Sequence, residues 1–288
     1  MPLLTYNDIY LQTRRTLRDG GVAAYDLEAR LIVEFASGKT RETYVRTARM
    51  FPPDGKFESA VLEYIARRLG GEPIAYITGE WEFYSLPMKV TADTLIPRAD
   101  TEILAERAIT LLRGGTSTAP RVLDMCCGTG CVGLAIAYNV PSARVVLADN
   151  SETVLAVARE NITRNALTRR VMAQLMDARE TPPPLFGPFD MIVCNPPYIP
   201  SADIERLDVS VRDYEPRAAL DGGEDGLEYF RDAARLWKSA LTAGGMMLFE
   251  VGVSQSGAVC DIMRTVGFTE VLTTPDLQGV QRVVEGRG

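Results

Sequence analysis

The first part of the chain has the hydrophobic periodicity of short amphipathic helices. From Leu27 to Phe35, apolar residues recur at helical spacing with charged residues between them. Two further stretches of this kind, 40–50 and 57–69, are set apart by breaks that contain glycine or proline. The pattern predicts a small helical bundle over residues 1–76.

The periodicity changes over residues 77–97. Apolar residues such as Trp81, Phe83 and Val90 alternate loosely with polar ones around Ser85-Leu86-Pro87. Alternation of this kind around a short break predicts a β-hairpin. We therefore expect this segment to form a hairpin linker between the bundle and the next domain.

From residue 98 onwards, short buried strands alternate with helical stretches. The expected strands are 121–124, 144–148, 189–194 and 246–251, with a C-terminal strand region that begins at Gly267. The expected helices are 101–112, 131–138, 151–165, 227–240 and 258–266. This alternation predicts an α/β domain over residues 98–288 with a doubly wound, mostly parallel sheet. Ligands of such sheets bind beyond the carboxyl ends of the strands.

Composition limits the chemistry that the chain can perform. It has 288 residues, a formal net charge of −7 and no histidine. An acidic chain lacks the general attraction to phosphate on which nucleic-acid binders depend, so we do not expect DNA or RNA as the main partner. Without histidine, Ser-His-Asp and Cys-His mechanisms are excluded, and any proton transfer must use carboxylates, tyrosine, lysine or water.

The cysteines and the apolar runs narrow the class of protein further. Cys126, Cys127 and Cys131 are clustered, but the chain has five cysteines, no CxxC pair and no histidine. We therefore expect small residues in a tight buried loop, with neither a disulfide framework nor a metal site. Residues 1–10 lack the pattern of a signal peptide, and no run of about 18 apolar residues occurs. The expected location is the cytoplasm, without a membrane-spanning segment.

The first motif with chemical content is the turn after the strand that ends at Asp124. Small residues and two glycines over 125–130 lead from this strand into a helix. Glycines let the backbone approach a ligand, and the helix N-terminus supplies free N–H groups. The spacing fits neither the nucleoside-triphosphate loop nor the dinucleotide motif, and Asp124 suits a cationic ligand such as S-adenosyl-L-methionine better than a phosphate. Another nucleotide cofactor and a purely structural turn are the alternatives for this loop taken alone.

Asp149 ends the next predicted strand. A carboxylate at this place can accept hydrogen bonds from both ribose hydroxyls of an adenosine. The alternative is that Asp149, Asn150 or Ser151 caps the helix that follows. Position alone does not separate the two interpretations, but the glycine turn upstream favours the ribose.

The run Asn195-Pro196-Pro197-Tyr198 follows an apolar strand. Its two prolines fix the backbone and remove two N–H donors, so the carbonyl groups of Asn195 and Pro196 face outward as acceptors. The Asn195 side-chain oxygen adds an acceptor, and Tyr198 adds an aromatic face. This set suits a planar NH2 group, held by oxygens and stacked on the ring. A plain turn is the alternative, and the preceding strand and the upstream loop argue against it.

In this order, the motifs resemble those of the release-factor glutamine N5-methyltransferases, the PrmC/HemK family. The matching stretches are 72–79, 82–84, 95–98, 122–130, 156–161, 195–200, 215–217, 219–223 and 282–285, which span nearly the whole chain. The resemblance implies a Rossmann-like S-adenosyl-L-methionine-dependent methyltransferase domain and an N-terminal helical domain that helps to hold a peptide chain release factor. It implies methylation of the side-chain amide N5 of the glutamine in a Gly-Gly-Gln loop, with S-adenosyl-L-homocysteine as the other product.

The resemblance also implies roles for individual residues. The cofactor would contact Asp124, Cys126, Cys127, Gly128, Thr129, Gly130, Asp149 and Asn195, with Asp177 and Ala178 near its adenine. The glutamine would be held by Asn195, Pro196, Pro197 and Tyr198, of which Asn195, Pro196 and Tyr198 would be catalytic. The family usually has glycine at the position of Cys126 and Pro-Glu at the position of Ala99-Asp100. Neither departure removes a group that the chemistry needs.

Three other functions are compatible with parts of this pattern. An adenine-N6 DNA methyltransferase acts on the same flat NH2 group, but it needs base flipping and a basic DNA cleft, against which the acidic balance argues. Glutamine methylation of a ribosomal protein is a sister possibility. A non-catalytic module that keeps the cofactor fold is the third, and the intact run from Asn195 to Tyr198 argues against it.

Overall fold

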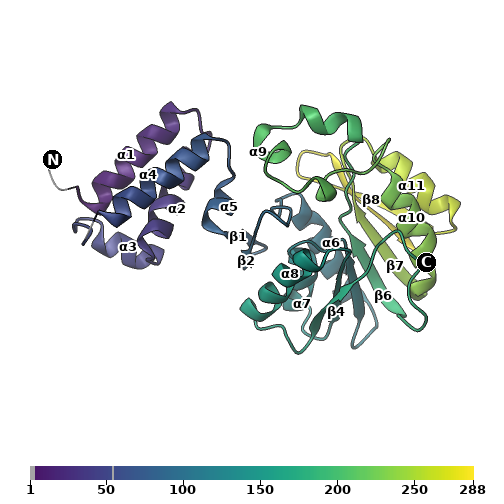
Figure 1. The fold of residues 1–288 in the computed structure, drawn as a ribbon. Coiled ribbons are helices and arrows are strands. Elements are labelled where there is room, and N and C mark those ends of the chain that lie inside the picture. The colour runs from purple at the N-terminus through teal and green to yellow at the C-terminus, as the bar shows by residue number, and fades with distance from the viewer. Residues whose placement is uncertain (1–3, 54) are drawn as a thin grey trace. The chain divides into compact units, whose positions relative to one another are not determined.

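The computed structural model describes residues 4–53 and 55–288; residues 1–3, where the predicted bundle begins, and residue 54 lie outside the described residues. The chain divides into two compact units, residues 1–79 and 80–288 (Figure 1). In the part of the chain that the structure describes, no helix combines the length and the apolar character needed to cross a bilayer.

The first unit is helical, as its periodicity predicts. Its helices are α1 (Tyr6–Asp19), α2 (Tyr25–Ser37), α3 (Arg41–Thr47), α4 (Lys56–Leu69) and α5 (Ile74–Thr78). A capping box starts α1, because the Thr5 side chain accepts from the Asp8 N–H while the Asp8 carboxylate accepts from the Thr5 N–H. The apolar faces of α1, α2 and α4 meet around fully buried Leu17 and Ile32.

The second unit begins with the predicted hairpin, formed by β1 (Glu80–Phe83) and β2 (Leu86–Lys89) in antiparallel pairing. The two turn residues, Tyr84 and Ser85, both have positive φ, 51° and 62°. Positive φ at both central residues is the geometry of a two-residue turn whose twist matches that of the strands. The Glu102 carboxylate of the next helix accepts from the Tyr84 N–H at 2.8 Å and ties the turn to the domain.

Seven strands form one sheet in the part of the second unit that the structure describes, in the order β5-β4-β3-β6-β7-β9-β8. They are β3 (Arg121–Met125), β4 (Arg144–Asp149), β5 (Val171–Leu175), β6 (Phe189–Cys194), β7 (Leu241–Glu250), β8 (Thr269–Pro275) and β9 (Gln281–Arg287). The strands from β5 to β7 run parallel, and β9 is antiparallel to both of its neighbours. The predicted α/β, mostly parallel sheet is therefore confirmed, with an antiparallel pair at one edge.

Helices cover both faces of this sheet, so each face has its own apolar core (Figure 1). One core contains α6 (Thr101–Gly114), α7 (Cys131–Asn139) and α8 (Glu152–Arg164), and the other contains α10 (Glu228–Trp237) and α11 (Ser256–Thr265). The connection from β6 to α10 contains a short α-helix, α9 (Val209–Arg212), and two 3₁₀ helices, Ser201–Arg206 and Arg217–Ala219. A third 3₁₀ helix, Lys238–Ala240, precedes β7. The two layers fix the carboxyl ends of the central strands in place.

The structure differs from the sequence prediction at two strands. β5 was not predicted, because its residues do not form a continuous apolar run. β7 begins at Leu241, before the predicted start at 246, since Gly244 with φ of 76° lets the strand continue through an irregularity opposite β6. Neither difference moves the carboxyl ends of β3, β4 and β6.

Candidate active site

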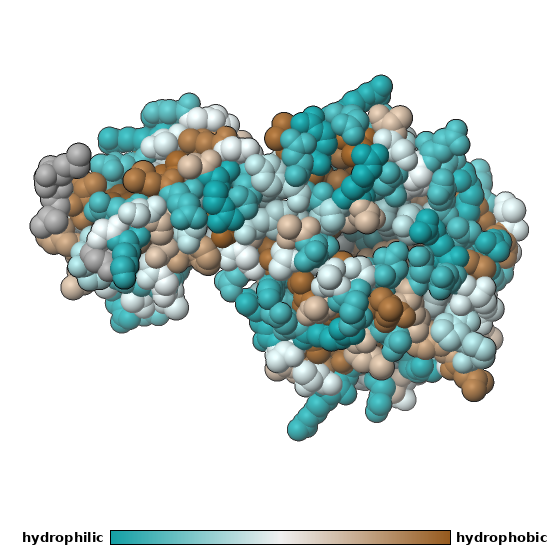
Figure 2. All heavy atoms as spheres, in the orientation of Figure 1, coloured by the Kyte–Doolittle hydropathy of each residue, from teal (hydrophilic) through white to brown (hydrophobic). Residues whose placement is uncertain are grey.

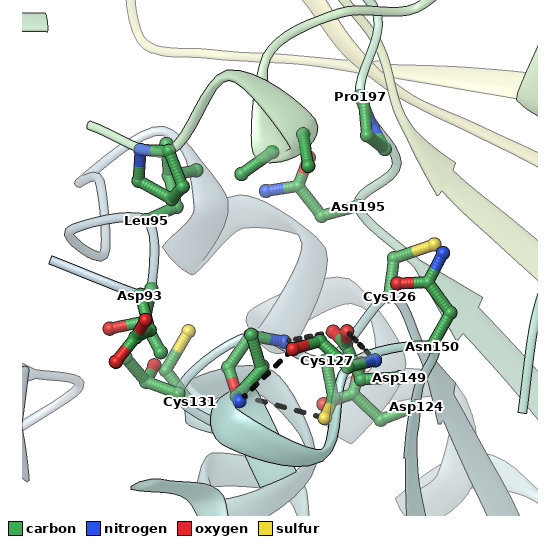
Figure 3. A pocket seen from close by; sticks show the side chains of 18 of the residues that line it. Asp93, Leu95, Asp124, Cys126, Cys127, Cys131, Asp149, Asn150, Asn195 and Pro197 are labelled. Carbon is green, nitrogen blue, oxygen red and sulfur yellow. Dashed lines mark hydrogen bonds between the residues drawn. The ribbon is translucent and has the colours of Figure 1, made fainter. Parts of the chain in front are cut away.

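A cavity of about 280 Å³ lies at the carboxyl ends of three neighbouring strands, β4, β3 and β6. Its lining includes the turn after β3, Asp149 at the end of β4, and Asn195 and Pro197 after β6. Asn195 and Pro197 lie on one side of it, and Asp124, Cys127 and Asp149 on the other (Figure 3). Parallel strands bring these residues together because their carboxyl ends meet at one edge of the sheet.

The turn after β3 has an unusual backbone. Cys126, Gly128 and Gly130 all have positive φ, 56°, 54° and 81°. A side chain at Gly130 would approach the Leu147 Cδ1 to 2.6 Å, so this position requires glycine. Cys126 holds the left-handed conformation with a side chain, at a cost of about 1 kcal/mol. The cysteine that departs from the family pattern therefore keeps the glycine-like conformation of the turn.

Asp124 lies in β3 and is nearly fully buried, at 2% exposure. Its Oδ2 accepts from the Gly133 N–H, in the first turn of α7, at 2.8 Å. Burial raises the pKa of Asp124 to about 8, although this hydrogen bond opposes the rise. A cation bound in the cavity would favour the ionised form of Asp124, and its binding would be stabilised by the negative charge of this carboxylate.

Asp149 accepts hydrogen bonds from two backbone N–H groups, those of Gly128 at 3.1 Å and Ser151 at 3.2 Å. Ser151 is the residue that caps α8, with its side chain accepting from the Val154 N–H. Asp149 is therefore not the cap of that helix, and it lines the cavity instead. Burial raises the pKa of its carboxyl group.

Asp177 and Ala178 follow β5 and also line the cavity. Asp177 accepts from the Asn150 side chain at 3.3 Å and from the Arg179 N–H at 2.8 Å. The Ala178 carbonyl accepts from the indole N–H of buried Trp237 at 3.1 Å. The loop after β5 is thus held in place by hydrogen bonds to Asn150 and to Trp237.

The charge of the lining has one sign. Four aspartates, Asp93, Asp124, Asp149 and Asp177, line the cavity, and within the described residues no lysine or arginine does. A pocket of this kind attracts a cation and repels phosphate groups. The lining therefore suits a ligand with an ammonium and a sulfonium, and does not suit a nucleoside triphosphate or a dinucleotide.

The Asn195–Tyr198 run is divided between the cavity and the surrounding protein. Asn195 and Pro197 line the cavity, whereas Pro196 and Tyr198 are not part of its lining. The Asn195 Nδ2 donates to the Thr101 Oγ1 at 3.3 Å, which leaves its side-chain oxygen available. Tyr198 donates from its hydroxyl to the Glu250 Oε1 at 3.4 Å, and its carbonyl accepts from the Gln255 side chain at 2.9 Å.

Three thiols contribute to the same lining. Cys126, Cys127 and Cys131 line the cavity as free cysteines. Burial raises the pKa of Cys131 to about 12 and holds that of Cys127 well above its ordinary value. The prediction of small residues in a tight loop describes these cysteines, two of which are buried.

Known proteins share both parts of the chain. Residues 101–209 match the model of the methyltransferase small domain, and residues 8–79 match that of the PrmC N-terminal domain. Over 276 residues, the chain is 38% identical to the release factor glutamine methyltransferase of Geobacter sulfurreducens, with 96% of this chain and 94% of that protein aligned. The chain belongs to the release factor glutamine methyltransferase family.

Further similarities support membership of the release factor glutamine methyltransferase family. The family member of Salmonella typhimurium is 37% identical over 273 residues, which cover 94% of each chain. Among solved structures, the catalytic domain of hMettl16 in complex with the MAT2A 3'UTR hairpin 6 shares the fold, with a TM-score of 0.55, 15% identity and 81% of each chain covered. The predicted family, fold class and enzyme class, a methyltransferase, are confirmed. The roles of individual residues remain predictions.

Sequence reasoning missed an ion pair that holds two walls of the cavity. Glu215 is buried and pairs with Arg98, and its other carboxylate oxygen accepts from the Ile96 N–H at 3.3 Å. Pro97 and Pro216, next to these two residues, both line the cavity. Both partners lie in stretches that match the release factor glutamine methyltransferase family, but their pairing across 117 positions is not readable from spacing.

Proposed function

We propose that this chain transfers a methyl group from S-adenosyl-L-methionine to the side-chain amide N5 of the glutamine in the Gly-Gly-Gln loop of peptide chain release factors. Membership of the release factor glutamine methyltransferase family supports the reaction. The observation that carries the proposal in this chain is one cavity whose charged lining residues are all aspartates and whose lining also contains Asn195 and Pro197.

The residues of the acidic side fit the methyl donor. Asp124 would balance the positive charge of the donor, and Asp149 would accept from its ribose hydroxyls with the lone pairs that the backbone leaves unused. Asp177 and Ala178 would border the adenine, with Tyr229 as a further aromatic neighbour in the lining. Cys126, Cys127, Gly128 and Thr129, which line the cavity, would form its floor, and Gly130 would keep the conformation of the turn that carries them. When bound, the donor supplies a methyl group on a positively charged sulfur.

Asn195 and Pro197 on the other side of the cavity, together with the adjoining Pro196 and Tyr198 outside its lining, would bind and orient the acceptor amide. Its nitrogen is a poor nucleophile because its lone pair is delocalised into the carbonyl group. The Asn195 side-chain oxygen and the backbone carbonyls of Asn195 and Pro196 would accept its two N–H bonds and stabilise the positive charge that builds up on nitrogen. Pro197 would shape the wall and Tyr198 would pack beside the amide. Holding the amide in one orientation supplies the entropic share of the catalysis.

The first unit would contribute to recognition of the release factor. Its match to the PrmC N-terminal domain supports this assignment, as does the number of large apolar side chains that it exposes. Such side chains are exposed on α1, α2, α3, α4 and the connection after α3, at Leu11, Leu27, Phe35, Val45, Met50, Phe51, Leu62 and Leu69. We propose residues 1–76 as the recognition domain, 77–97 as the linker and 98–288 as the catalytic domain.

A methyl-transfer assay with labelled donor tests the proposal. Purified release factor, a variant of it with the loop glutamine replaced by alanine, a ribosomal-protein mixture and duplex DNA are offered in parallel. We expect label in the intact release factor and none in the alanine variant. Label in DNA or in a ribosomal protein, with an unlabelled release factor, would replace the proposal by one of the alternative functions. Calorimetry with the donor alone separates a failure of donor binding from a failure of acceptor recognition.

A further inference from the structure

A buried carboxyl group that the sequence did not single out lies behind the acceptor side of the cavity. Glu250 is the last residue of β7 and is 3% exposed. Its Oε1 accepts from the Tyr198 hydroxyl, whereas its Oε2 is buried and has no hydrogen-bond partner among the described residues. Burying a carboxylate that is only partly satisfied costs stability, so its presence calls for a role in function.

Glu250 is connected to both polar side chains of the Asn195–Tyr198 run. Tyr198 is a direct partner, and the Thr101 hydroxyl is the second group that interacts with the Glu250 carboxyl. Thr101 in turn accepts from the Asn195 Nδ2 at 3.3 Å. The connection therefore runs from Glu250 through Thr101 to Asn195.

The direction of these hydrogen bonds decides which atom Asn195 presents to the cavity. An ionised carboxylate only accepts, and a hydroxyl has a single proton. If Thr101 gives that proton to Glu250, its lone pairs face Asn195 and select the Nδ2 end of the amide. The Asn195 Oδ1 is then left as an acceptor, which is the atom that an incoming amide N–H group needs.

We propose that Glu250 is a positioning residue that, as an ionised acceptor, sets the orientation of Asn195 through Thr101 and that of Tyr198 directly. The inference rests on the proposed function, because it concerns the amide that these two side chains would hold. A neutral Glu250 or a glutamine in its place can donate to Thr101. Thr101 would then donate to Asn195 and select its oxygen, so that the amide presents NH2 to the acceptor.

The surroundings make Glu250 the group that changes charge near neutral pH on this side of the cavity. Burial raises the pKa of Glu250 to about 7, opposed by the hydrogen bonds from Thr101 and Tyr198. Asp100 at the start of α6 and Arg282 on β9 also face it, and they pair with each other at 2.9 Å. Tyr198 and Cys131 on α7 stay neutral, because burial raises the pKa of each. Since the ionised form is the active one, turnover should rise with pH through about 7.

The experiment compares Glu250→Gln with the wild type in steady-state assays on intact release factor at saturating donor. We expect kcat to fall about tenfold or more, the scale of a misplaced reacting group, with the donor Kd unchanged. The wild-type kcat should rise through about pH 7, and that of Glu250→Gln should not. Glu270→Gln, an exposed carboxylate on β8, is the matched control and should behave as the wild type.

Substitutions of Thr101 test the connection itself. Thr101→Val should lower kcat as Glu250→Gln does, Thr101→Ser should restore it, and the losses should not add in the double variant. If Glu250→Gln fails to fold by circular dichroism, the Thr101 pair carries the test. An unchanged kcat and pH profile in Glu250→Gln, or additive losses, would overturn the inference. A wild type that does not methylate the release factor would instead overturn the proposed function.

Discussion

At the scale of single residues, Asp124 shows how burial and ligand chemistry act on one group. Its raised pKa, about 8, means that the folded protein favours the protonated acid relative to the unfolded chain, whose carboxyl has the ordinary value of 3.8. This contribution to stability is complete below that ordinary value and is lost as the pH rises through about 8. Asp124→Asn stays neutral, so its free energy of unfolding should fall less than that of the wild type between about pH 5 and pH 8.

Urea denaturation at several pH values measures this difference. Asp261→Asn, an exposed carboxylate on α11, serves as the control and should follow the wild type. Parallel curves for Asp124→Asn and the wild type would show that the ionisation of Asp124 does not contribute to the pH dependence of stability. Calorimetry in buffers of different ionisation enthalpy adds a second measurement, because a bound cation should release a proton from Asp124 near neutral pH.

Asn195 carries the second prediction at this scale. Asn195→Ala removes the side-chain acceptor, and kcat should fall by about 10²-fold, the usual effect of deleting one hydrogen-bonding group that acts on developing charge. Single-turnover assays with labelled donor measure the loss. Asn139→Ala, at the end of α7 and outside the cavity lining, is the matched control. Near-normal turnover of Asn195→Ala would contradict its assigned role.

At the scale of elements, an ion pair with a buried carboxylate of β9 contributes to the packing of α6 against the sheet. Arg107 on α6 donates twice to the Glu285 carboxylate at 2.6 Å, and the Glu285 side chain is 1% exposed. Arg107→Met leaves this carboxylate buried and unpaired, so the free energy of unfolding should fall by about 3–5 kcal/mol. Guanidinium denaturation measures the change.

Two controls separate burial from charge. Arg287→Met, which removes an exposed pair with Glu270, should cost no more than about 1 kcal/mol. Arg107→Met combined with Glu285→Gln should recover part of the loss, because the second change removes the unpaired charge. Equal losses in Arg107→Met and Arg287→Met would refute the importance of burial at this pair.

Much of the architecture follows from local patterns in the sequence. The alternation of strands and helices predicts the parallel core of the sheet. Continuous apolar runs such as 189–194 are typical of strands that are buried on both faces of a parallel sheet. The strand β5 is less apolar and gives no such signal. The edge pair of β8 and β9 depends on antiparallel pairing, which no local pattern specifies.

The candidate site could be predicted where its residues follow strands directly. The glycine turn, Asp149 and Asn195 belong to this class, since the fold brings strand ends together. Glu250, and the pairing of Arg98 with Glu215, could not be predicted in this way. Their partners lie about 50 to 120 positions away in the chain, and which of many carboxylates meets which donor is decided by packing. The cap of α8 was open for a different reason, because three consecutive residues, Asp149, Asn150 and Ser151, can all cap a helix.

At the scale of the whole molecule, the proposed assignment of recognition to the first unit and of catalysis to the second predicts that substitutions in the first unit affect only the binding of the release factor. Figure 2 shows apolar atoms at the surface of this unit, and Leu62 on α4 is 67% exposed. Leu62→Lys should raise the KM for intact release factor about tenfold, as for loss of one apolar anchor worth about 1.4 kcal/mol, without changing the donor Kd. Steady-state assays with intact release factor and with a short Gly-Gly-Gln peptide measure this.

The peptide and a second variant provide the controls. Turnover of the peptide should not change in Leu62→Lys, because a short peptide has no surface for the first unit to bind. Leu272→Lys, a change at another exposed leucine on β8 in the second unit, should leave both KM values as they are. A wild-type KM for release factor in Leu62→Lys would remove this part of α4 from the recognition surface.

The neutral thiols around the cavity have a consequence for the lifetime of the enzyme. A sulfonium is an alkylating agent, and the species that it alkylates on cysteine is the thiolate. Because burial keeps Cys127 and Cys131 protonated, they are poor competitors for the reagent that the pocket would hold. Two of the three thiols that line the cavity are therefore protected against alkylation by a bound sulfonium, and the pocket would not inactivate itself through them.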